Sequence, residues 1–134
     1  MPRKPKDVTD AELAILQLLW DRGSATVRDL TQTLYPSGTG SDLATVQKLL
    51  KRLESKQCVE RDRTTWPHQF RPALAREELI GRRLQTTADA LCAGSLEPLV
   101  THLVRSRLTT AERDKLRSLL SELESQRKID GDRK

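Results

Sequence analysis

The chain has 134 residues, which is enough for one medium-sized domain or for a small domain with a helical extension. Its cysteines, Cys58 and Cys92, form no CxxC pair and have no histidine cluster near them in sequence, which argues against a disulfide framework and a zinc site. The sequence has no signal-peptide pattern and no run of roughly 18 apolar residues, so we expect a cytoplasmic protein without membrane insertion.

The charge balance permits a polyanionic partner without requiring one. The formal net charge is +5 and the pI is near 9.6. Aromatic residues make up only 3% of the chain, which disfavours proteins that bind single-stranded nucleic acid by stacking bases on aromatic rings. Among nucleic acids, duplex DNA therefore remains the better candidate.

The N-terminal third predicts a basic arm followed by two helices. Residues 1–8 mix prolines with lysine and arginine and are expected to form a flexible arm. Thr9 and Glu12 have the spacing of a capping box, which predicts a helix that ends at Gly23. A brief second helix is expected to begin after Thr26, which can cap it.

A third helix is predicted over residues 41–55, after a loop over 35–40 that is rich in Pro, Ser and Gly. Ser41 or Asp42 is expected to cap it. Its apolar face is formed by Leu43, Val46, Leu49, Leu50 and Leu53. The opposite, mostly cationic face carries Thr45, Gln47, Lys48, Lys51, Arg52 and Lys56. The segment is therefore an amphipathic basic helix.

A short hairpin is predicted next. Residues 58–63 alternate as a strand should, and residues 68–71 can return as a second strand after a turn. Arg61 and Arg63 then lie near the tip of the hairpin. Trp66 either contacts a ligand at the tip or packs the hairpin against the helices of the same domain.

Only helices are predicted from Ala75 onward. The first covers about 76–92, the second begins at 97 or 98, and the third begins at a capping box at Thr109 and ends at 124. The tail over 125–134 is polar and expected to fray. The leucine-rich faces of these helices are expected to be buried, and self-association of two chains would bury them. The expected dimerisation residues are Leu79, Leu84, Leu91, Leu99, Leu103, Leu116, Leu119, Leu120 and Leu123. Alternatively, the helices fold back on the N-terminal domain of a monomer.

The order of three helices and a hairpin predicts a winged helix-turn-helix, so the expected fold is mainly α with a small β-hairpin wing. Residues 9–74 are expected to form this DNA-binding domain and residues 75–124 a helical dimerisation domain. In this fold the third helix enters the major groove of duplex DNA and the wing flanks the backbone. The expected DNA contacts are Thr45, Gln47 and Lys48 near the bases, and Lys51, Arg52, Arg61 and Arg63 on the phosphates.

Less specific interpretations explain the same residues. A solvated surface would account for the cations of the third helix without any ligand. Arg61 and Arg63 could pair with Glu60 and Asp62 in place of phosphates. A winged helix can also serve as an adaptor that docks a protein partner and has no operator.

No enzyme, cofactor or metal site is expected. The sequence has no GxSxG, HExxH or P-loop pattern, and its carboxylates are scattered rather than paired. His68 and His102 stand alone, with no second metal ligand at a useful spacing.

Over roughly residues 8–124 the chain resembles the penicillinase-repressor (BlaI/MecI-type) family of bacterial transcriptional regulators. The matching pieces are "TDAELAILQLLWDRGSATVRDL", "TVQKLLKRLESKQCVERDR", "HQFRPAL" and "GSLEPLVTHLV…LTTAERDKLRSLL". The resemblance implies a winged-helix domain, a helical dimerisation domain and repression by a homodimer on a palindromic operator. It also implies relief of repression by cleavage after a signal from a membrane-bound sensor protease.

The sequence departs from the family pattern at three places. Residues 101–103 read Thr-His-Leu where the best-known members have an Asn-Phe cleavage bond. Leu43 and Ala44 replace an aromatic and a hydroxyl residue, while Thr45 matches. The cysteine-rich metal-sensing tail of copper-responsive relatives is absent. Hence the sequence predicts no metal ligand, and it does not specify the operator, the regulated genes, the inducing signal, the cleavage site or a redox role for the cysteines.

Overall fold

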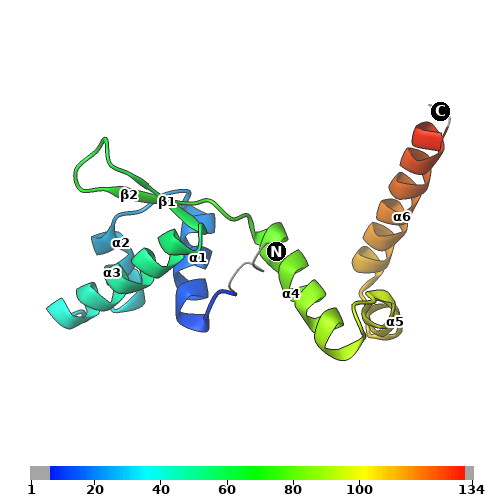
Figure 1. Cartoon of the computed structure of the whole chain (residues 1–134), viewed down its shortest axis with the longest axis horizontal. Coiled ribbons are helices and arrows are strands. Elements are labelled where there is room, and N and C mark those ends of the chain that lie inside the picture. Colours follow the sequence, from blue (N-terminus) through cyan, green and yellow to red (C-terminus); the bar gives the residue numbers. More distant parts are fainter. Residues whose placement is uncertain (1–6, 132–134) are drawn as a thin grey trace. The chain divides into compact units, whose positions relative to one another are not determined.

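The structure is a computed structural model that describes residues 7–131 of the chain, and it is mainly α-helical with a two-stranded hairpin (Figure 1). In chain order the elements are α1 (Asp10–Arg22), α2 (Val27–Leu34), α3 (Gly40–Ser55), β1 (Val59–Asp62), β2 (Gln69–Pro72), α4 (Arg76–Leu91), α5 (Glu97–Arg105) and α6 (Thr110–Gly131). The predicted fold class and the order of the elements are confirmed.

The chain divides into two compact units, residues 1–83 and 84–134, which we call the N-terminal unit and the C-terminal unit. The division falls inside α4, because the first turns of that helix pack on the N-terminal unit. Leu79, which the sequence assigned to dimerisation, is buried in the core of this unit and has no surface to offer a partner.

Capping interactions fix where the helices begin. At α1, Thr9 Oγ1 accepts a hydrogen bond from the Glu12 N–H at 3.3 Å, and the Glu12 carboxylate accepts from the Thr9 N–H at 3.3 Å. Thr26 caps α2, as predicted. At α3 the expected cap was wrong, because the helix begins at Gly40 with Thr39 as its N-cap. Asp42 lies inside the first turn and accepts from the Thr39 N–H at 2.9 Å.

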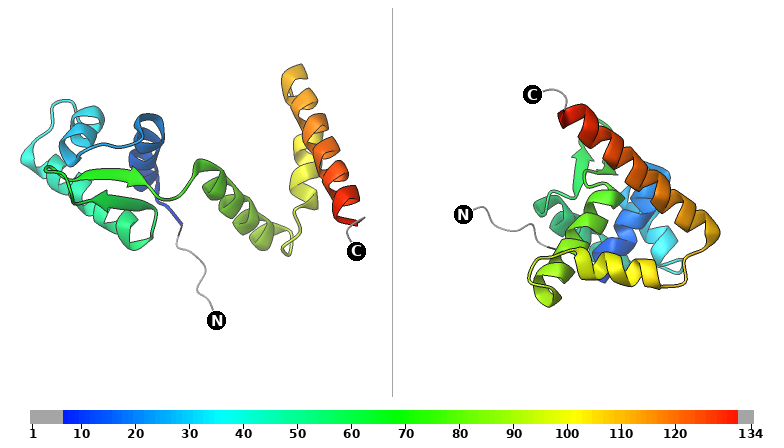
Figure 2. Two further views of the ribbon diagram at one scale, coloured as in Figure 1. Left: turned by 90° about the horizontal axis from the view of Figure 1, so that it is seen from above. Right: turned by 90° about the vertical axis from the view of Figure 1, so that its right-hand side faces the viewer.

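The core of the N-terminal unit lies between α1, α2, α3 and the hairpin (Figure 2). It is formed by apolar side chains at helical spacing on α1 and α3, together with Phe70 and Val59 of the two strands. The strands pair antiparallel with Val59 opposite Pro72. Ala25 adds a one-residue bridge to Phe70, with N···O distances of 3.0 and 2.8 Å, so the hairpin is fixed to the segment between α1 and α2.

Leu43 does not belong to this core. The sequence assigned it to the apolar face of the third helix, but 36% of its surface is exposed, whereas Val46 and Leu50 on the same helix are buried. Successive residues of a helix turn by about 100°, so Leu43 lies at the edge of the buried side, where the core has ended.

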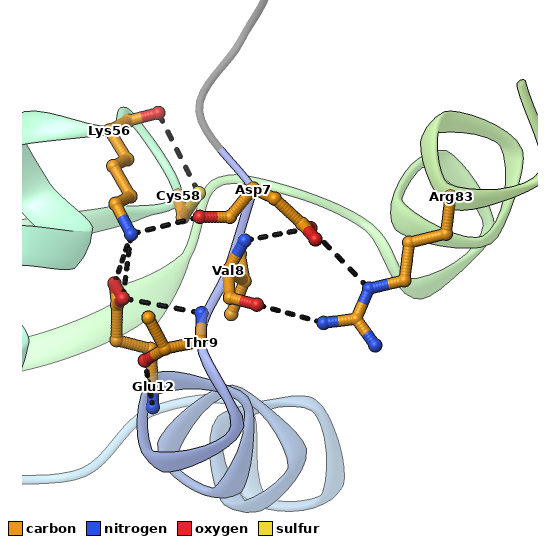
Figure 3. A network of polar contacts seen from close by, with 7 residues as sticks. All are labelled: Asp7, Val8, Thr9, Glu12, Lys56, Cys58 and Arg83. Carbon is orange, nitrogen blue, oxygen red and sulfur yellow. Dashed lines mark hydrogen bonds and ion pairs between the residues drawn. The ribbon is translucent and has the colours of Figure 1, made fainter. Parts of the chain in front are cut away.

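The start of the described chain and the end of α3 meet in a polar network (Figure 3). Lys56 Nζ donates to the two carboxylate oxygens of Glu12, at 2.6 and 2.9 Å, and to the Asp7 carbonyl at 2.9 Å. Lys56 was expected on the cationic outer face of the third helix, but it is half-buried and its charge is matched by the fully buried Glu12.

The same network corrects the predicted arm. Val8 was included in a flexible segment, yet it is buried and part of the core, and its N–H donates to the Asp7 carboxylate at 2.8 Å. The spacing of Val8 and Leu13 is that of a hydrophobic staple, which explains this burial. The remainder of the predicted arm, residues 1–6, lies outside the described residues.

The C-terminal unit buries very little in a single chain. Among its described residues Ala88 alone is buried, and neither α5 nor α6 has a buried residue. Large apolar side chains are exposed on all three helices, including Leu91, Leu103 and Leu123. α6 continues to Gly131, so the expected fraying after residue 124 was wrong for residues 125–131.

The Glu12–Lys56 pair predicts a specific dependence of stability on pH. Burial acts to raise the pKa of Glu12, but hydrogen bonds from Lys56 and Thr9 outweigh it, and the pKa lies below the ordinary value of 4.5. The ionised Glu12 carboxylate therefore stabilises the native protein fully above pH 4.5, and this stabilisation is lost as the pH falls through the lowered pKa.

Replacing Lys56 with Met leaves a buried carboxylate without its cation. We expect the free energy of unfolding at pH 7 to fall by about 3–5 kcal/mol, because the uncompensated charge remains inside the protein. Without Lys56, burial raises the pKa of Glu12, so part of the loss should be recovered on acidification from pH 7 to pH 5. Urea unfolding at pH 7 and pH 5 measures the loss of stability at each pH, with Lys48→Met on the exposed face of α3 as the control. An equal, pH-independent loss in both variants would contradict the account.

Candidate nucleic-acid interface

The outer face of α3 is exposed because the opposite face forms the core. Val46, Leu49, Leu50 and Leu53 are buried on the inner side of the helix. At about 100° per residue, the positions opposite them are those of Ala44, Lys48 and Lys51. All the DNA contacts predicted on this helix are exposed: Thr45, Gln47, Lys48, Lys51 and Arg52.

A groove of about 1010 Å³ runs beside this face, between α3, the first turn of α2 and the hairpin. Leu43, Gln47 and Lys51 line it from α3, since residues four apart lie one above the other on a helix. The other lining residues are Thr26, Val27, Arg28, Asp29, Arg61, Trp66, Pro67, His68 and Phe70. The groove therefore joins the predicted reading helix to the predicted wing.

The predicted contacts on α3 do not all point the same way. Thr45 and Gln47 are two positions apart, so their side chains leave the helix about 200° apart, on opposite sides of Lys48. Thr45 and Arg52 do not line the groove. The Thr45 hydroxyl also donates to the Ser41 carbonyl at 3.0 Å, which leaves its methyl group and an acceptor lone pair for a ligand.

The hairpin arginines share one carboxylate on α3. Glu54 lies 3.4 Å from the Arg61 guanidinium and 3.9 Å from that of Arg63. The alternative partners expected from the sequence were wrong, because Glu60 pairs with Arg71 at 3.1 Å and Asp62 accepts from Thr64. Those hydrogen bonds from Thr64 lower the pKa of Asp62.

Arg61 and Arg63 differ in their surroundings. The Arg61 side chain is 27% exposed, stacks over the Phe70 ring at 4.9 Å, and has a buried Nε without a hydrogen-bond partner among the described residues. The Arg63 side chain is 69% exposed. Arg61 is thus held on the wall of the groove, whereas Arg63 is free to change partner.

Two further groove residues were not among the predicted contacts. Arg28 is exposed in the first turn of α2 and faces the same groove as Lys51. Trp66, for which the sequence left two roles open, is 87% exposed and contacts His68 in an edge-to-face arrangement at 5.0 Å. It does not pack the hairpin against the helices. A signal for Arg28 was available, because the second helix of this motif lies against the third.

The charge around the groove is mainly positive. Arg28, Lys51 and Arg61 line it together with a single acidic residue, Asp29. Hydrogen bonds from the backbone and the side chain of Thr26 lower the pKa of Asp29, and its carboxylate caps the start of α2. This carboxylate already accepts a hydrogen bond, and Arg61 is paired with Glu54. Arg28 and Lys51, which have no ion-pair partner among residues 7–131, are the cations of the groove that an anionic ligand can meet.

Other classes of site receive no support from residues 7–131. No group of three or more His, Cys, Asp or Glu side chains that could hold a metal ion occurs within that range. Of the helices described, none is both long enough and apolar enough to cross a bilayer.

An exposed cationic helix beside a β-hairpin, on a core of three helices, defines the class of winged-helix transcriptional regulators. The family model described as "Penicillinase repressor" matches residues 8–122. The chain belongs to this penicillinase repressor family, whose members are transcriptional regulators and not enzymes, as the sequence predicted.

Two relatives and two solved structures illustrate the similarity. The transcriptional regulators BlaI from two strains of Mycobacterium tuberculosis are each 35% identical over 120 residues, which cover 87% of this chain and 84% of the relative. AbfR of Staphylococcus epidermidis is 19% identical with a TM-score of 0.42, over 91% of this chain and 72% of that one. A MarR mutant from E. coli, solved with operator DNA, is 21% identical with a TM-score of 0.44, over 87% and 76%.

The different surroundings of Arg61 and Arg63 lead to a prediction. We expect Arg61→Gln to lower the free energy of unfolding by about 1–2 kcal/mol, because it removes both the ring contact and a half-buried ion pair. We expect Arg63→Gln to change it by less than about 0.5 kcal/mol, as is usual at exposed positions. Urea unfolding of the two variants compares them directly, and equal losses would show that Arg63 is as firmly held as Arg61.

Proposed function

We propose that the protein is a homodimeric, sequence-specific DNA-binding repressor that occupies a palindromic operator. The observation that carries this proposal is the exposed cationic side of α3, which opens into the groove formed with the hairpin. An α-helix with its side chains is about 10–12 Å across, and the major groove of B-DNA is about 12 Å wide. A helix whose outer face is not covered by its own chain can therefore enter it.

The residues of α3 divide by chemistry within this proposal. Gln47 can pair with the N6 and N7 groups of adenine, and Lys48 with the O6 and N7 groups of guanine. Thr45 offers its methyl group to a thymine methyl, and its oxygen can accept a hydrogen bond from the amino group of an adenine or a cytosine. Lys51 and Arg52 hold phosphates on the two sides of the helix, which fixes its register along the duplex.

The hairpin and α2 contact the backbone beside the major groove. Arg63 exchanges Glu54 for a phosphate, because its ion pair is long and exposed. Arg61 maintains the wall of the groove and contributes its charge from there. Arg28 adds a cation from α2, and the exposed ring of Trp66 packs on a sugar at the tip of the wing.

The C-terminal unit supplies the dimer in this proposal. The DNA-binding module predicted over residues 9–74 also holds the first turns of α4, and the helices beyond Arg83 pair with those of a second copy. A chain with no buried residue on α5 or α6 must cover their apolar faces elsewhere, and a twofold partner does so with the same faces. The proposed contacts are Leu84, Leu91, Leu99, Leu103, Leu116, Leu119, Leu120 and Leu123. A twofold pair places two reading helices about 34–36 Å apart, which matches a palindromic site.

The remaining parts of the proposal come from the family. Repression takes place in the cytoplasm, and a sensor protease relieves it by cleaving the repressor. Thr101 and His102 on α5 are exposed and are not among the proposed dimer contacts, which is compatible with access by a protease. No cofactor is required for DNA binding of this kind.

Specific binding can be separated from general attraction to DNA by two substitutions. We expect Lys51→Ala to weaken binding to every duplex and to reduce the dependence of log K on log salt by about one unit, since it removes one phosphate contact. We expect Gln47→Ala to cost about 1–3 kcal/mol mainly at one base pair. Gel shifts at several salt concentrations on a duplex selected from a random pool, with a scrambled duplex as the reference, measure both effects.

Two outcomes of these gel shifts would count against the proposal. If both substitutions acted equally on the selected and scrambled duplexes, the division between base and phosphate contacts would be wrong. If the unchanged protein selected no duplex over competitor DNA, the protein would be an adaptor that uses its winged helix to dock a protein partner.

The dimer can be tested independently of DNA. We expect the unchanged protein to sediment as a dimer and Leu120→Glu to sediment as a monomer, because an ionised carboxylate cannot be buried in an apolar interface without a partner. Leu43→Glu makes the same chemical change on an exposed leucine of the N-terminal unit and should remain dimeric. Sedimentation equilibrium distinguishes the three proteins, and a monomeric unchanged chain would refute the dimer.

A further inference from the structure

Residues 7 and 8 form a short strap across one side of the N-terminal unit (Figure 3). The Val8 side chain is buried in the core, so the backbone of the strap is fixed in place. The carbonyl of Val8 accepts a hydrogen bond from Arg83 Nη2 at 2.8 Å, and the Asp7 carboxylate accepts from Arg83 Nε at 3.4 Å. One arginine of α4 therefore holds both residues of the strap.

The other side of the strap is held by the reading helix. Lys56, which terminates α3, donates to the Asp7 carbonyl at 2.9 Å and to the buried carboxylate of Glu12. The backbone of Asp7 and Val8 thus lies between the end of α3 and the middle of α4, with a hydrogen bond to each.

Arg83 is also the last residue of α4 that belongs to the N-terminal unit. One turn earlier, on the same face of the helix, Leu79 is buried in the core. Before that, Arg76 lies over the Trp20 ring at 5.1 Å and pairs with Asp21 at 3.7 Å. Arg76 and Leu79 attach the first turns of α4, and Arg83 adds an attachment one turn further on, where it constrains the direction in which the helix leaves the unit.

We propose that Arg83, acting through the Asp7–Val8 strap and Lys56, is a positioning residue that sets the direction of α4 relative to α3. This inference rests on the proposed dimer, because α4 continues into the C-terminal unit and so links each reading helix to the twofold contact. The strap then determines which separation between two half-sites the repressor accepts.

The geometry of a helix makes this control sensitive. The 16 residues of α4 span about 24 Å at 1.5 Å per residue. Counted from Leu79, the 12 residues to Leu91 span about 18 Å, so a tilt of about 11° displaces the end of α4 by about 3.4 Å, which is the rise of one base pair. One base pair also rotates a half-site by about 34–36° around the duplex. Small changes at Arg83 should therefore be readable as a change in spacing preference.

The test is a series of duplexes that keep both half-sites, as selected by the unchanged protein from a random pool, and differ by one or two base pairs at the centre. The unchanged protein should bind the selected spacing best. We divide the Kd for the duplex whose spacing differs by one base pair by the Kd for the selected duplex. In Arg83→Met this ratio should fall at least about threefold, because α4 can now adapt to both spacings. Arg83→Lys keeps a donor for the Val8 carbonyl and should restore most of the ratio.

Arg22→Met provides a matched control. It removes an arginine of the same unit whose guanidinium donates to the Thr33 hydroxyl at 2.6 Å, within the helix-turn-helix itself. Its spacing profile should match that of the unchanged protein. If Arg83→Met also kept that profile while remaining folded and dimeric, the inference would be overturned.

A measurement without DNA separates this inference from the proposed function. Nitroxide labels at Lys48→Cys, in a Cys92→Ser background, report the distance between the two reading helices of a dimer by electron paramagnetic resonance. Cys58 is buried, and burial raises the pKa of its thiol, so it should not be labelled. Arg83→Met should widen the distance distribution, and Arg22→Met should not.

The two measurements fail in different ways. If no duplex is selected but the distance distribution widens, the operator proposal fails and the strap still controls α4. An unchanged distribution overturns the inference whatever the DNA results. A chain without dipolar coupling between protomers would be a monomer, and a monomer has no spacing for the strap to set.

Discussion

Glu12 is fully buried at the start of α1, and its charge is compensated by Lys56, which ends α3, and by the backbone and hydroxyl of Thr9. A buried carboxylate is unfavourable unless it is paired and hydrogen-bonded, so the fold that satisfies Glu12 is the one that brings these two helices together. The pair joins the end of α3 to the start of α1, on the same side as the buried Val46, Leu49, Leu50 and Leu53, so the lysines within α3 face outward. The exposed face beside the groove follows from this arrangement. The same ammonium group also binds the Asp7 carbonyl, so the strap depends on the pair as well.

Much of this fold could be predicted from local sequence patterns. The capping boxes at Thr9 and Thr26 and the alternation around the hairpin are signals between near neighbours, and these elements are present where they were expected. The failures involve partners that are distant in sequence or the edges of a face. Lys56 has its partner 44 residues away, and the Val8 carbonyl is bonded to an arginine 75 residues away, although the burial of the Val8 side chain follows from the local staple spacing to Leu13. Periodicity placed Leu43 on the apolar side but could not show where the core ends.

The candidate interface was predictable to a similar extent. A helical repeat was sufficient to predict that the proposed DNA contacts of α3 are exposed, because burial of one side of the helix determines the other. It did not show that Glu54 lies between the hairpin and α3, since that contact depends on how the strands pack. For the same reason the two hairpin arginines looked equivalent, although one stacks on Phe70 and the other is exposed. Arg28 was not among the predicted contacts although the motif places the second helix beside the third, and it lines the groove that α2 and α3 share.

In the proposed dimer, α4 connects the two properties that a repressor with two DNA-binding heads needs. Its first turns are buried in the unit that carries α3, and its remaining turns belong to a unit that covers few of its own apolar side chains. Binding through two linked heads is stronger than binding through one, because the second contact forms at a high effective concentration and only when the heads match the spacing of the sites. Under the proposed function, an event that separates two C-terminal units, or that loosens α4 at its base, weakens operator binding without altering any residue of α3. The chemistry of recognition and the control of affinity can therefore reside on different parts of one chain.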